Sequence, residues 1–298
     1  MQSNPSTEAE EWERRGIEAD SRSQHAEAEA CFAKALTYDD SRQFSWVGLA
    51  FSQINQRRVD DAVASLQRAH IARPTCGIIS HLLKAMTGET TSRAPNDYIT
   101  FLFNGYAANF DQHLTSLQYQ GPQMLAELIK RAGWAADGTR HIIDIGCGTG
   151  LSGMPLRAYA GRLEGADLSA SMLEQALKRG IYNHLWHGEA HAVLRRLPAG
   201  SYDAVVAADT LVYIGDVAEF FRLAHAALRP GGDLLFTVEA CDEGFALVKS
   251  GRYQHSDAYL KACADGLFSC ADRVDGAIRT EAQQAIPGHA YRFSKPAA

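Results

Sequence analysis

Three glycines follow a short apolar run in the segment HIIDIGCGTGLSG, which begins at His141. Glycines permit tight turns and let a ligand approach the backbone, so an apolar run followed by such a turn suits a nucleotide-like ligand. The spacing departs from the dinucleotide fingerprint G-x-G-x-x-G, because its third glycine position holds Leu151 and Gly150 comes one residue early. Asp144, at the expected mouth of the loop, would repel a pyrophosphate but favour a cation. These residues predict a site for S-adenosylmethionine, which carries a sulfonium and an ammonium and no phosphate.

Two more carboxylates occupy positions that suit the same ligand. Asp167 ends the second expected strand, 21 residues beyond Gly146, where an acidic side chain can accept both ribose hydroxyls. Glu189 follows the third expected strand in HGEAH, where the adenine edge would lie. The three acidic positions are therefore expected to surround one cofactor.

The motifs DIGCGTG, GADLSASML, GEA, SYDAVVAADTLVYI and LRPGG follow one another in this order. Together they resemble class I S-adenosylmethionine-dependent methyltransferases over roughly residues 98–298. The resemblance implies cofactor contacts along the chain. Those for the methionine part lie at Gly146, Cys147 and Gly148, and those for the ribose lie at Asp167 and Leu168, with Met172 packing nearby. Glu189 and Ala190 are implied at the adenine, and Asp209 beneath the sulfonium. The family commonly has aspartate where this chain has Glu189.

An aromatic segment precedes the glycine loop and is expected to cover the cofactor as a lid. Tyr106, Phe110 and His113 are spaced by four and three residues, which would place them on one helical face. Tyr106 is expected against the methionine end of the cofactor, and His113 is a candidate proton acceptor. The alternative is an aromatic face that only packs on the sheet.

Further candidates for catalysis follow the fourth and fifth expected strands. Tyr213 could shape the substrate pocket, and Glu239 ends the fifth strand, where it either joins the site or pairs on the surface. The segment SGRYQHS is expected as a polar loop that closes the pocket with Arg252, Tyr253 and His255. No Cys/His metal spacing occurs, so the prediction is metal-free methyl transfer. Whether oxygen, nitrogen, carbon or sulfur accepts the methyl group stays open.

Strand-like and helical segments alternate around these residues. The expected strands are 141–145, 162–167, 183–188, 203–209 and 233–239, followed by a final pair at 272–279 and 289–295. The segment LRPGG is expected to close a helix before the fifth strand. This alternation predicts an α/β, Rossmann-like domain with helices on both faces of the sheet. The family resemblance implies seven strands, mostly parallel, with the last strand antiparallel.

The N-terminal part of the chain contains a repeat of 34 residues. The pairs related by this offset are Trp12 and Trp46, Gly16 and Ala50, Ala28 and Ala62, Phe32 and Leu66, and Ala35 and Ala69. The pattern resembles the tetratricopeptide repeat, with copies at 9–42 and 43–76 and a capping helix at GIISHLLKAMTG. Both tryptophans are expected to be buried. The domains are then a repeat domain at 1–90, a flexible linker, and a methyltransferase domain with an N-terminal lid helix at 96–298.

Composition limits the class of protein without naming a substrate. The 298 residues carry a formal net charge of −6, and there is no basic block that would hold a nucleic acid. The six cysteines show no CxxC pairing, and no apolar run is long enough to span a membrane. We therefore expect a cytoplasmic methyltransferase that acts on a small-molecule metabolite. The alternative is a protein-modifying enzyme or a scaffold whose repeats recruit a partner or self-associate.

Overall fold

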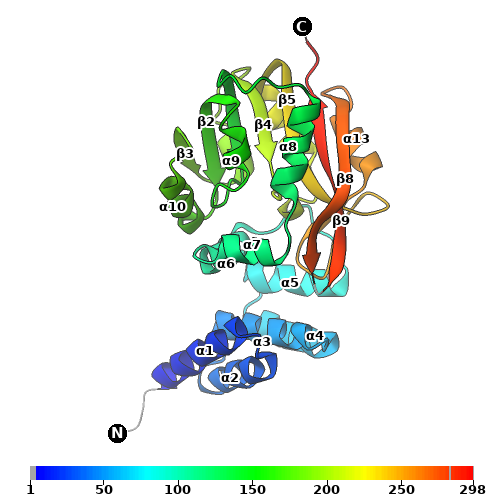
Figure 1. Cartoon of the computed structure of the whole chain (residues 1–298). Helices are drawn as coiled ribbons and strands as arrows, with labels where there is room; N and C mark the ends of the chain where they lie inside the picture. The colour runs from blue at the N-terminus through cyan, green and yellow to red at the C-terminus, as the bar shows by residue number, and fades with distance from the viewer. Residues whose placement is uncertain (1–4, 282, 298) are drawn as a thin grey trace. The chain divides into compact units, whose positions relative to one another are not determined.

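The computed structural model describes residues 5–281 and 283–297, apart from the side chain of Tyr106. The chain divides into two compact units, which Figure 1 shows in chain order by colour. The first unit contains the N-terminal helices together with Val248–Gly251, and the second contains Thr91–Leu247 and Arg252–Ala298.

The described residues of the first unit form five helices. Their bounds are α1 Pro5–Ser21, α2 His25–Tyr38, α3 Gln43–Asn55, α4 Val59–Ala72 and α5 Gly77–Thr87. The helix α5 covers the expected capping segment and is followed by Gly88, whose left-handed backbone ends the helix.

Small and apolar side chains at the 34-residue offset lie inside this unit. Ala28 and Ala62 are fully buried, and so are Ala35 and Ala69. Phe32 packs so closely on the helix α1 that a Cβ at Gly16 would collide with its ring. The repeat pattern thus marks the helix contacts, while its assignment to the tetratricopeptide family stays a prediction.

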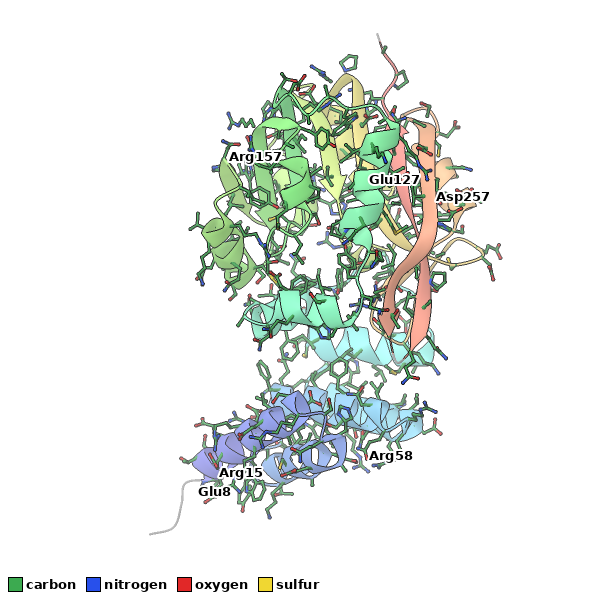
Figure 2. The ribbon with its side chains drawn as sticks, viewed as in Figure 1. Glu8, Arg15, Arg58, Glu127, Arg157 and Asp257 are labelled. Carbon is green, nitrogen blue, oxygen red and sulfur yellow. The ribbon has the colours of Figure 1, made fainter. Side chains whose placement is uncertain are left out.

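The expectation that both tryptophans are buried is wrong. Trp12 and Trp46 are only half-buried. The guanidinium of the half-exposed Arg15, which Figure 2 labels, lies 4.8 Å from the centroid of the Trp12 ring. The Trp46 indole donates a hydrogen bond to the Asp40 carbonyl at 2.8 Å. Because an indole ring keeps one polar edge, such partners hold it near the surface.

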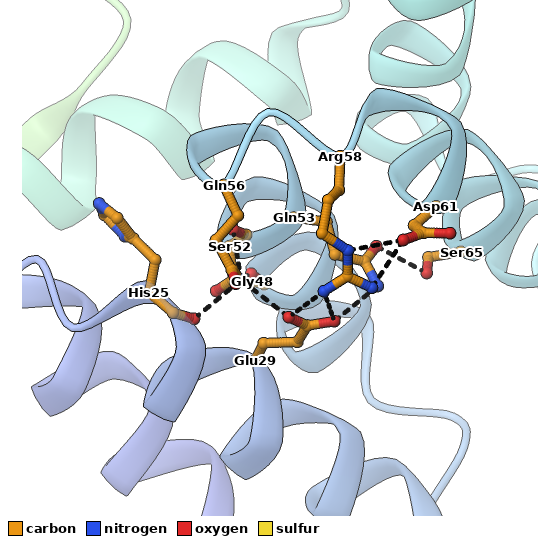
Figure 3. A network of polar contacts seen from close by, with 9 residues as sticks. All are labelled: His25, Glu29, Gly48, Ser52, Gln53, Gln56, Arg58, Asp61 and Ser65. Atoms are coloured by element: carbon orange, nitrogen blue, oxygen red, sulfur yellow. Dashed lines mark hydrogen bonds and ion pairs between the residues drawn. The ribbon is translucent and has the colours of Figure 1, made fainter.

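Ion pairs connect helices that are two apart in the chain. Arg42 precedes α3 and reaches back to Glu13 of α1 at 2.6 Å, and Arg58 precedes α4 and reaches back to Glu29 of α2 at 2.7 Å. Figure 3 shows the second pair, in which Glu29 also accepts a hydrogen bond from Gln56 at 2.7 Å. These contacts thus link each helix to the helix that follows its neighbour in the chain.

The second unit is a sheet covered by helices. Its strands are β1 Arg140–Ile145, β2 Ala160–Asp167, β3 His184–His187, β4 Tyr202–Ala207, β5 Leu228–Ala240, β6 Phe245–Leu247, β7 Tyr253–His255, β8 Ser269–Glu281 and β9 Gln284–Ser294. Its helices are α6 Asn96–Tyr106, α7 Phe110–Ser116, α8 Gly121–Arg131, α9 Gly153–Leu156, α10 Ala170–Arg179, α11 Ala190–Leu194, the 3₁₀ helix η1 Leu211–Tyr213, α12 Ala218–Ala227 and α13 Asp257–Ala264.

The strands β3, β2, β1, β4 and β5 lie side by side in that order and are parallel. The strand β9 pairs with β5 antiparallel, and β8 pairs with β9. This confirms a Rossmann-like, mostly parallel sheet with an antiparallel last strand.

Alternate residues of each central strand enter two separate cores. Ile142 of β1 packs with the helices α8 and α9, which lie in front of the sheet in Figure 1. Ile143 faces the opposite core, which contains α11, α12 and α13. Because the strands are apolar on both faces, the sheet is buried between two helical layers.

Several expected boundaries differ from the structure. The described strands number nine, because the short hairpin of β6 and β7 adds to the expected seven. It pairs with the end of β5, where Glu239 and Ala240 lie opposite Gln254 and His255. The segment LRPGG does not close a helix; it begins β5, because the helix α12 already ends at Ala227.

The expected lid helix and linker also differ. Residues 107–109 separate α6 from α7, so the aromatic segment is two helices. The linker is not loose, since Ala94 donates a backbone hydrogen bond to Tyr213 at 3.0 Å and Asp216 donates one to Ser92 at 2.8 Å.

Candidate active site

The glycine loop follows β1 at the carboxyl edge of the sheet. The three glycines have positive φ values of 70° at Gly146, 53° at Gly148 and 93° at Gly150. A Cβ at Gly146 would collide with the side chain of Thr210, which donates to the Ile145 carbonyl at 2.7 Å. Both conformation and close packing therefore require glycine here.

Asp167 ends β2 and binds this loop. One carboxylate oxygen accepts the Gly148 amide at 2.9 Å, and the other accepts the Ser169 amide at 2.8 Å. Burial raises the pKa of Asp167, although these backbone hydrogen bonds oppose the shift. Since each carboxylate oxygen has two lone pairs, the group can still accept hydrogen bonds from a ligand in the adjoining cavity.

Glu189 is the N-cap residue of the helix α11 and lines the cavity at this edge of the sheet. Its carboxylate accepts the backbone amides of His191 and Ala192, each at 3.0 Å, and lies 3.3 Å from the guanidinium of Arg93. Burial opposes ionisation, but these hydrogen bonds and the His191 ring lower the pKa of Glu189 to about 2. The residue thus caps a helix in addition to facing the expected adenine position.

Asp209 follows β4 in a strained conformation. Its φ is 53°, which non-glycine residues seldom adopt outside constrained sites. Its backbone amide donates to the Thr237 hydroxyl at 2.8 Å, which helps to hold this conformation. Oδ1 of Asp209 is buried without a hydrogen-bond partner among the described residues, and the guanidinium of Arg279 lies 3.8 Å away. Such an unsatisfied carboxylate oxygen suits a ligand that brings a donor or a positive charge.

The strand ends and the lid helices enclose one cavity. From the expected cofactor set, its lining includes Gly146, Cys147, Gly148, Asp167, Leu168, Glu189, Ala190 and Asp209. The lining also contains Phe110, His113 and Tyr213. The prediction for the Tyr106 side chain lies outside the described residues.

Hydrogen bonds fasten the lid helices to the sheet. Asp111 of α7 accepts a hydrogen bond from the Thr149 hydroxyl at 2.6 Å and forms an ion pair with Arg179. Ser169 donates to the amide oxygen of Asn104 on α6 at 2.6 Å. The lid is therefore attached to the glycine loop and to the segment after β2, the two places that would hold the cofactor.

Two residues of the expected cofactor set are not in the cavity lining. Asp144 is not at the mouth of the loop, because it is fully buried and accepts a hydrogen bond from the Tyr182 hydroxyl at 2.7 Å. Burial raises the pKa of Asp144 to about 7. Met172 is fully buried in the first turn of α10, so it packs beneath the site without lining it.

Two of the expected catalytic residues are also outside the cavity lining. Glu239 is 2% exposed and accepts a hydrogen bond from Arg279. His255 is fully buried, and its Nε2 lies 2.9 Å from the Ile214 carbonyl. Burial lowers the pKa of His255 to about 4. The structure thus does not bring these two residues to the cavity, because β7 pairs with the end of β5 where a polar loop was expected.

The cavity contains residues that the sequence did not single out as site residues. These are Arg93, Ala94, Ile99, Leu102, Phe103, Leu114, Tyr119, Leu151, Ser152 and Thr210, among others. The Phe103 ring packs edge-on against both Phe110 at 5.9 Å and Tyr213 at 5.4 Å between centroids. A helical period over 96–106 could have indicated the apolar face of α6, but no local signal places Tyr119 or Arg93 at a cavity.

The described residues contain no group of three or more His, Cys, Asp or Glu side chains arranged to hold a metal ion. No helix in this part of the chain is long and apolar enough to cross a membrane.

Comparisons with known proteins agree with this geometry. Residues 143–236 match the family described as a methyltransferase domain. The chain is 32% identical to human methyltransferase-like protein 27 over 105 residues, which are 35% of this chain and 43% of that protein. It is 29% identical to a malonyl-[acyl-carrier protein] O-methyltransferase of Halalkalibacterium halodurans over 52% of this chain and 56% of the relative. The matches thus span about half the length of these two relatives.

Solved structures share the fold at low sequence identity. An S-adenosylmethionine-dependent methyltransferase of Leishmania major superposes with a TM-score of 0.55 at 18% identity, over 66% of this chain and 82% of that one. A chain from the Haloferax volcanii complex of a methyltransferase and its activator superposes with a TM-score of 0.53 at 16% identity. The superposition covers 67% of this chain and 98% of that chain. Residues 143–236 thus match a methyltransferase domain, and the chain shares its fold with S-adenosylmethionine-dependent methyltransferases, which supports S-adenosylmethionine as the cofactor.

Proposed function

We propose that the chain transfers a methyl group from S-adenosylmethionine to a small molecule, in line and without a metal. One observation carries the proposal: the glycine loop, Asp167, Glu189 and Asp209 line a single cavity under the helices α6 and α7. Ligands of open α/β sheets bind at the carboxyl ends of the strands, and these residues gather at that edge.

The residues around the cavity fit the cofactor. Asp167 accepts the ribose hydroxyls with the lone pairs that Gly148 and Ser169 leave available. Glu189 lies at the adenine end, and the unsatisfied Oδ1 of Asp209 faces the cationic end. When bound, S-adenosylmethionine supplies a methyl group that is already activated by the sulfonium, so the transfer needs no Lewis acid.

The chain contributes orientation, water exclusion and, where needed, a proton acceptor. Phe103, Phe110 and Leu114 give the cavity an apolar roof, which excludes water from the methyl group. His113 lies at the exposed rim of the cavity, and its partial burial and the nearby charge of Arg252 lower its pKa. The imidazole is therefore neutral at physiological pH and able to accept a proton from a protonated substrate.

The names of two groups of relatives support a small or carrier-bound acceptor. They are the malonyl-[acyl-carrier protein] O-methyltransferases and the ubiquinone biosynthesis O-methyltransferases, both named for transfer to oxygen. We propose a small-molecule acceptor for this chain too, because the helices α6 and α7 cover its cavity.

The proposal is tested by titrating the full chain with S-adenosylhomocysteine in a calorimeter. We expect a dissociation constant in the micromolar range, on the order of −8 kcal/mol. A screen of metabolite extracts with methyl-labelled S-adenosylmethionine then identifies the acceptor by mass spectrometry. No binding of the product by folded protein would overturn the proposed function, and label found only in protein would overturn the small-molecule class.

A further inference from the structure

Arg252 is the second arginine of the cavity lining, besides Arg93, which pairs with Glu189. Arg252 directly precedes β7 and lines the cavity together with Tyr213 and Asp209. Its side chain is 19% exposed. The strand β7, which follows Arg252, pairs with the end of β5, so this arginine lies at the cavity beside an added strand and not in the polar loop expected from the sequence.

The carboxylates behind Arg252 are shared with a second arginine. Oε1 of Glu281 accepts hydrogen bonds from both Arg252 and Arg279, each at 2.6 Å. Glu239 accepts a hydrogen bond from Arg279 and lies 3.9 Å from Arg252. Asp209 lies 3.8 Å from Arg279, and Asp209 and Tyr213 also interact with Arg252. We assign the Asp209 carboxylate to the cationic cofactor, which leaves two carboxylates to two guanidinium groups. Neither Glu281 nor Glu239 is therefore a partner of Arg252 alone.

Aromatic and aliphatic side chains line the cavity next to this charge. Leu102, Phe103 and Phe110 come from the lid, and Tyr213 follows β4. A guanidinium at one end of an apolar cavity suits a molecule with an apolar body and a planar anionic group, because arginine binds carboxylates through a fork of parallel donors.

From this arrangement we infer that the substrate is a small carboxylic acid with an apolar body, and that Arg252 binds its carboxylate. The inference rests on the proposed function and assigns a substrate class to that site. A carboxylate is also a competent methyl acceptor at neutral pH, since it is already ionised.

The transfer balances without a proton acceptor. A lone pair of one carboxylate oxygen forms the new O–C bond while the S–C bond breaks, and the bonding pair stays on sulfur. The products are a neutral methyl ester and S-adenosylhomocysteine. Opposite charges of acceptor and donor cancel in the reaction, which a water-poor cavity favours. Glu239 and His255 do not line the cavity, and His113, which does, has no proton to accept in this transfer.

The test compares three probes of one shape and different charge: 3-phenylpropanoate, 3-phenylpropanamide and 3-phenylpropylamine. Each is titrated into the full chain saturated with S-adenosylhomocysteine, and binding is measured by ligand-observed NMR. We expect the acid to bind at least about tenfold more tightly than the amide or the amine. We also expect the acid, incubated with S-adenosylmethionine, to yield its methyl ester by mass spectrometry.

Two variants test whether the guanidinium of Arg252 causes the preference for the acid. Arg252→Met should remove the preference for the acid, and Arg252→Lys should keep part of it. Glu281 stays bound to Arg279 in both variants, so the fold should survive, and a thermal melt checks this. Arg222→Met on the exposed face of α12 is the matched control and should bind all three probes as the wild type does.

Amide or amine binding as tight as that of the acid would overturn the inference. So would the absence of binding by all three probes, or an unchanged preference in Arg252→Met. Binding of S-adenosylhomocysteine in the same samples separates this result from failure of the proposed function. If the protein still binds S-adenosylhomocysteine but does not prefer the acid to the amide or the amine, only the proposed substrate class is overturned.

Discussion

Replacing Asp167 with asparagine tests whether one carboxylate both shapes the glycine loop and binds the ribose. In the wild type its two oxygens accept the amides of Gly148 and Ser169 at 2.9 and 2.8 Å. Asparagine retains one acceptor oxygen, but its NH₂ group then faces one of these two amide donors. The variant therefore loses one backbone hydrogen bond and the negative charge that strengthens the contacts to the ribose hydroxyls.

We expect this change to cost about 2–3 kcal/mol of cofactor binding, because hydrogen bonds to charged groups contribute about 1.5–3 kcal/mol each and part of that remains with the amide. The dissociation constant for S-adenosylhomocysteine should then rise roughly 30- to 150-fold. Calorimetry measures it directly. Since asparagine also removes a buried charge, the free energy of unfolding should change by only about 1 kcal/mol.

Asp203→Asn is the matched control. Asp203 is 7% exposed and lies at the opposite edge of the sheet, where its carboxylate accepts the His141 amide at 2.7 Å. This variant should lower stability by about 1–3 kcal/mol while leaving the dissociation constant unchanged. If Asp167→Asn binds the product as tightly as the wild type does, the ribose assignment is wrong. A similar loss of affinity in both variants would show that the effect is general destabilisation.

Three further predictions concern the lid, the substrate proton and pH. Asp111→Ala removes the contacts from α7 to Thr149 and Arg179. Without ligand, the backbone amides of residues 96–116 should then exchange hydrogen faster than in the wild type, and they should regain protection when S-adenosylhomocysteine binds. Equal hydrogen exchange in wild type and variant would refute this attachment of the lid. Because a carboxylate acceptor carries no proton, His113→Ala should lower turnover of the acid by less than about tenfold, and a fall of about 10²-fold would instead identify a proton acceptor. Burial raises the pKa of Asp144 to about 7, above its ordinary value of 3.8, so its contribution to stability is complete below about pH 4 and is lost as pH rises through 7. Asp144→Asn should therefore show a flatter dependence of unfolding free energy between about pH 4 and pH 7, measured by urea denaturation, and an unchanged slope would contradict the assignment.

Local sequence patterns predicted the parallel strands of the sheet and most of the residues that line the cavity at their carboxyl ends. Apolar runs that end in glycine or an acid, as at Gly146 and Asp167, mark the carboxyl ends of buried parallel strands. Those ends meet at one edge because the strands are parallel, so strand order and spacing already bring the cofactor residues together. The small residues at the 34-residue offset, such as Ala28 and Ala62, likewise predict close helix contacts wherever they recur.

The substrate end depended on tertiary structure, because pairing between distant segments decides which side chains face the cavity. Glu239 and His255 are outside the cavity lining since β7 pairs with the end of β5 and buries both, whereas the same pairing leaves Arg252 in the lining. The sequence alone determined that this chain has an S-adenosylmethionine-type glycine loop with acidic residues at the strand ends. Only the tertiary structure decided which charge faces the acceptor, because a short polar segment has no local preference strong enough to choose between a solvent-exposed loop and an added strand.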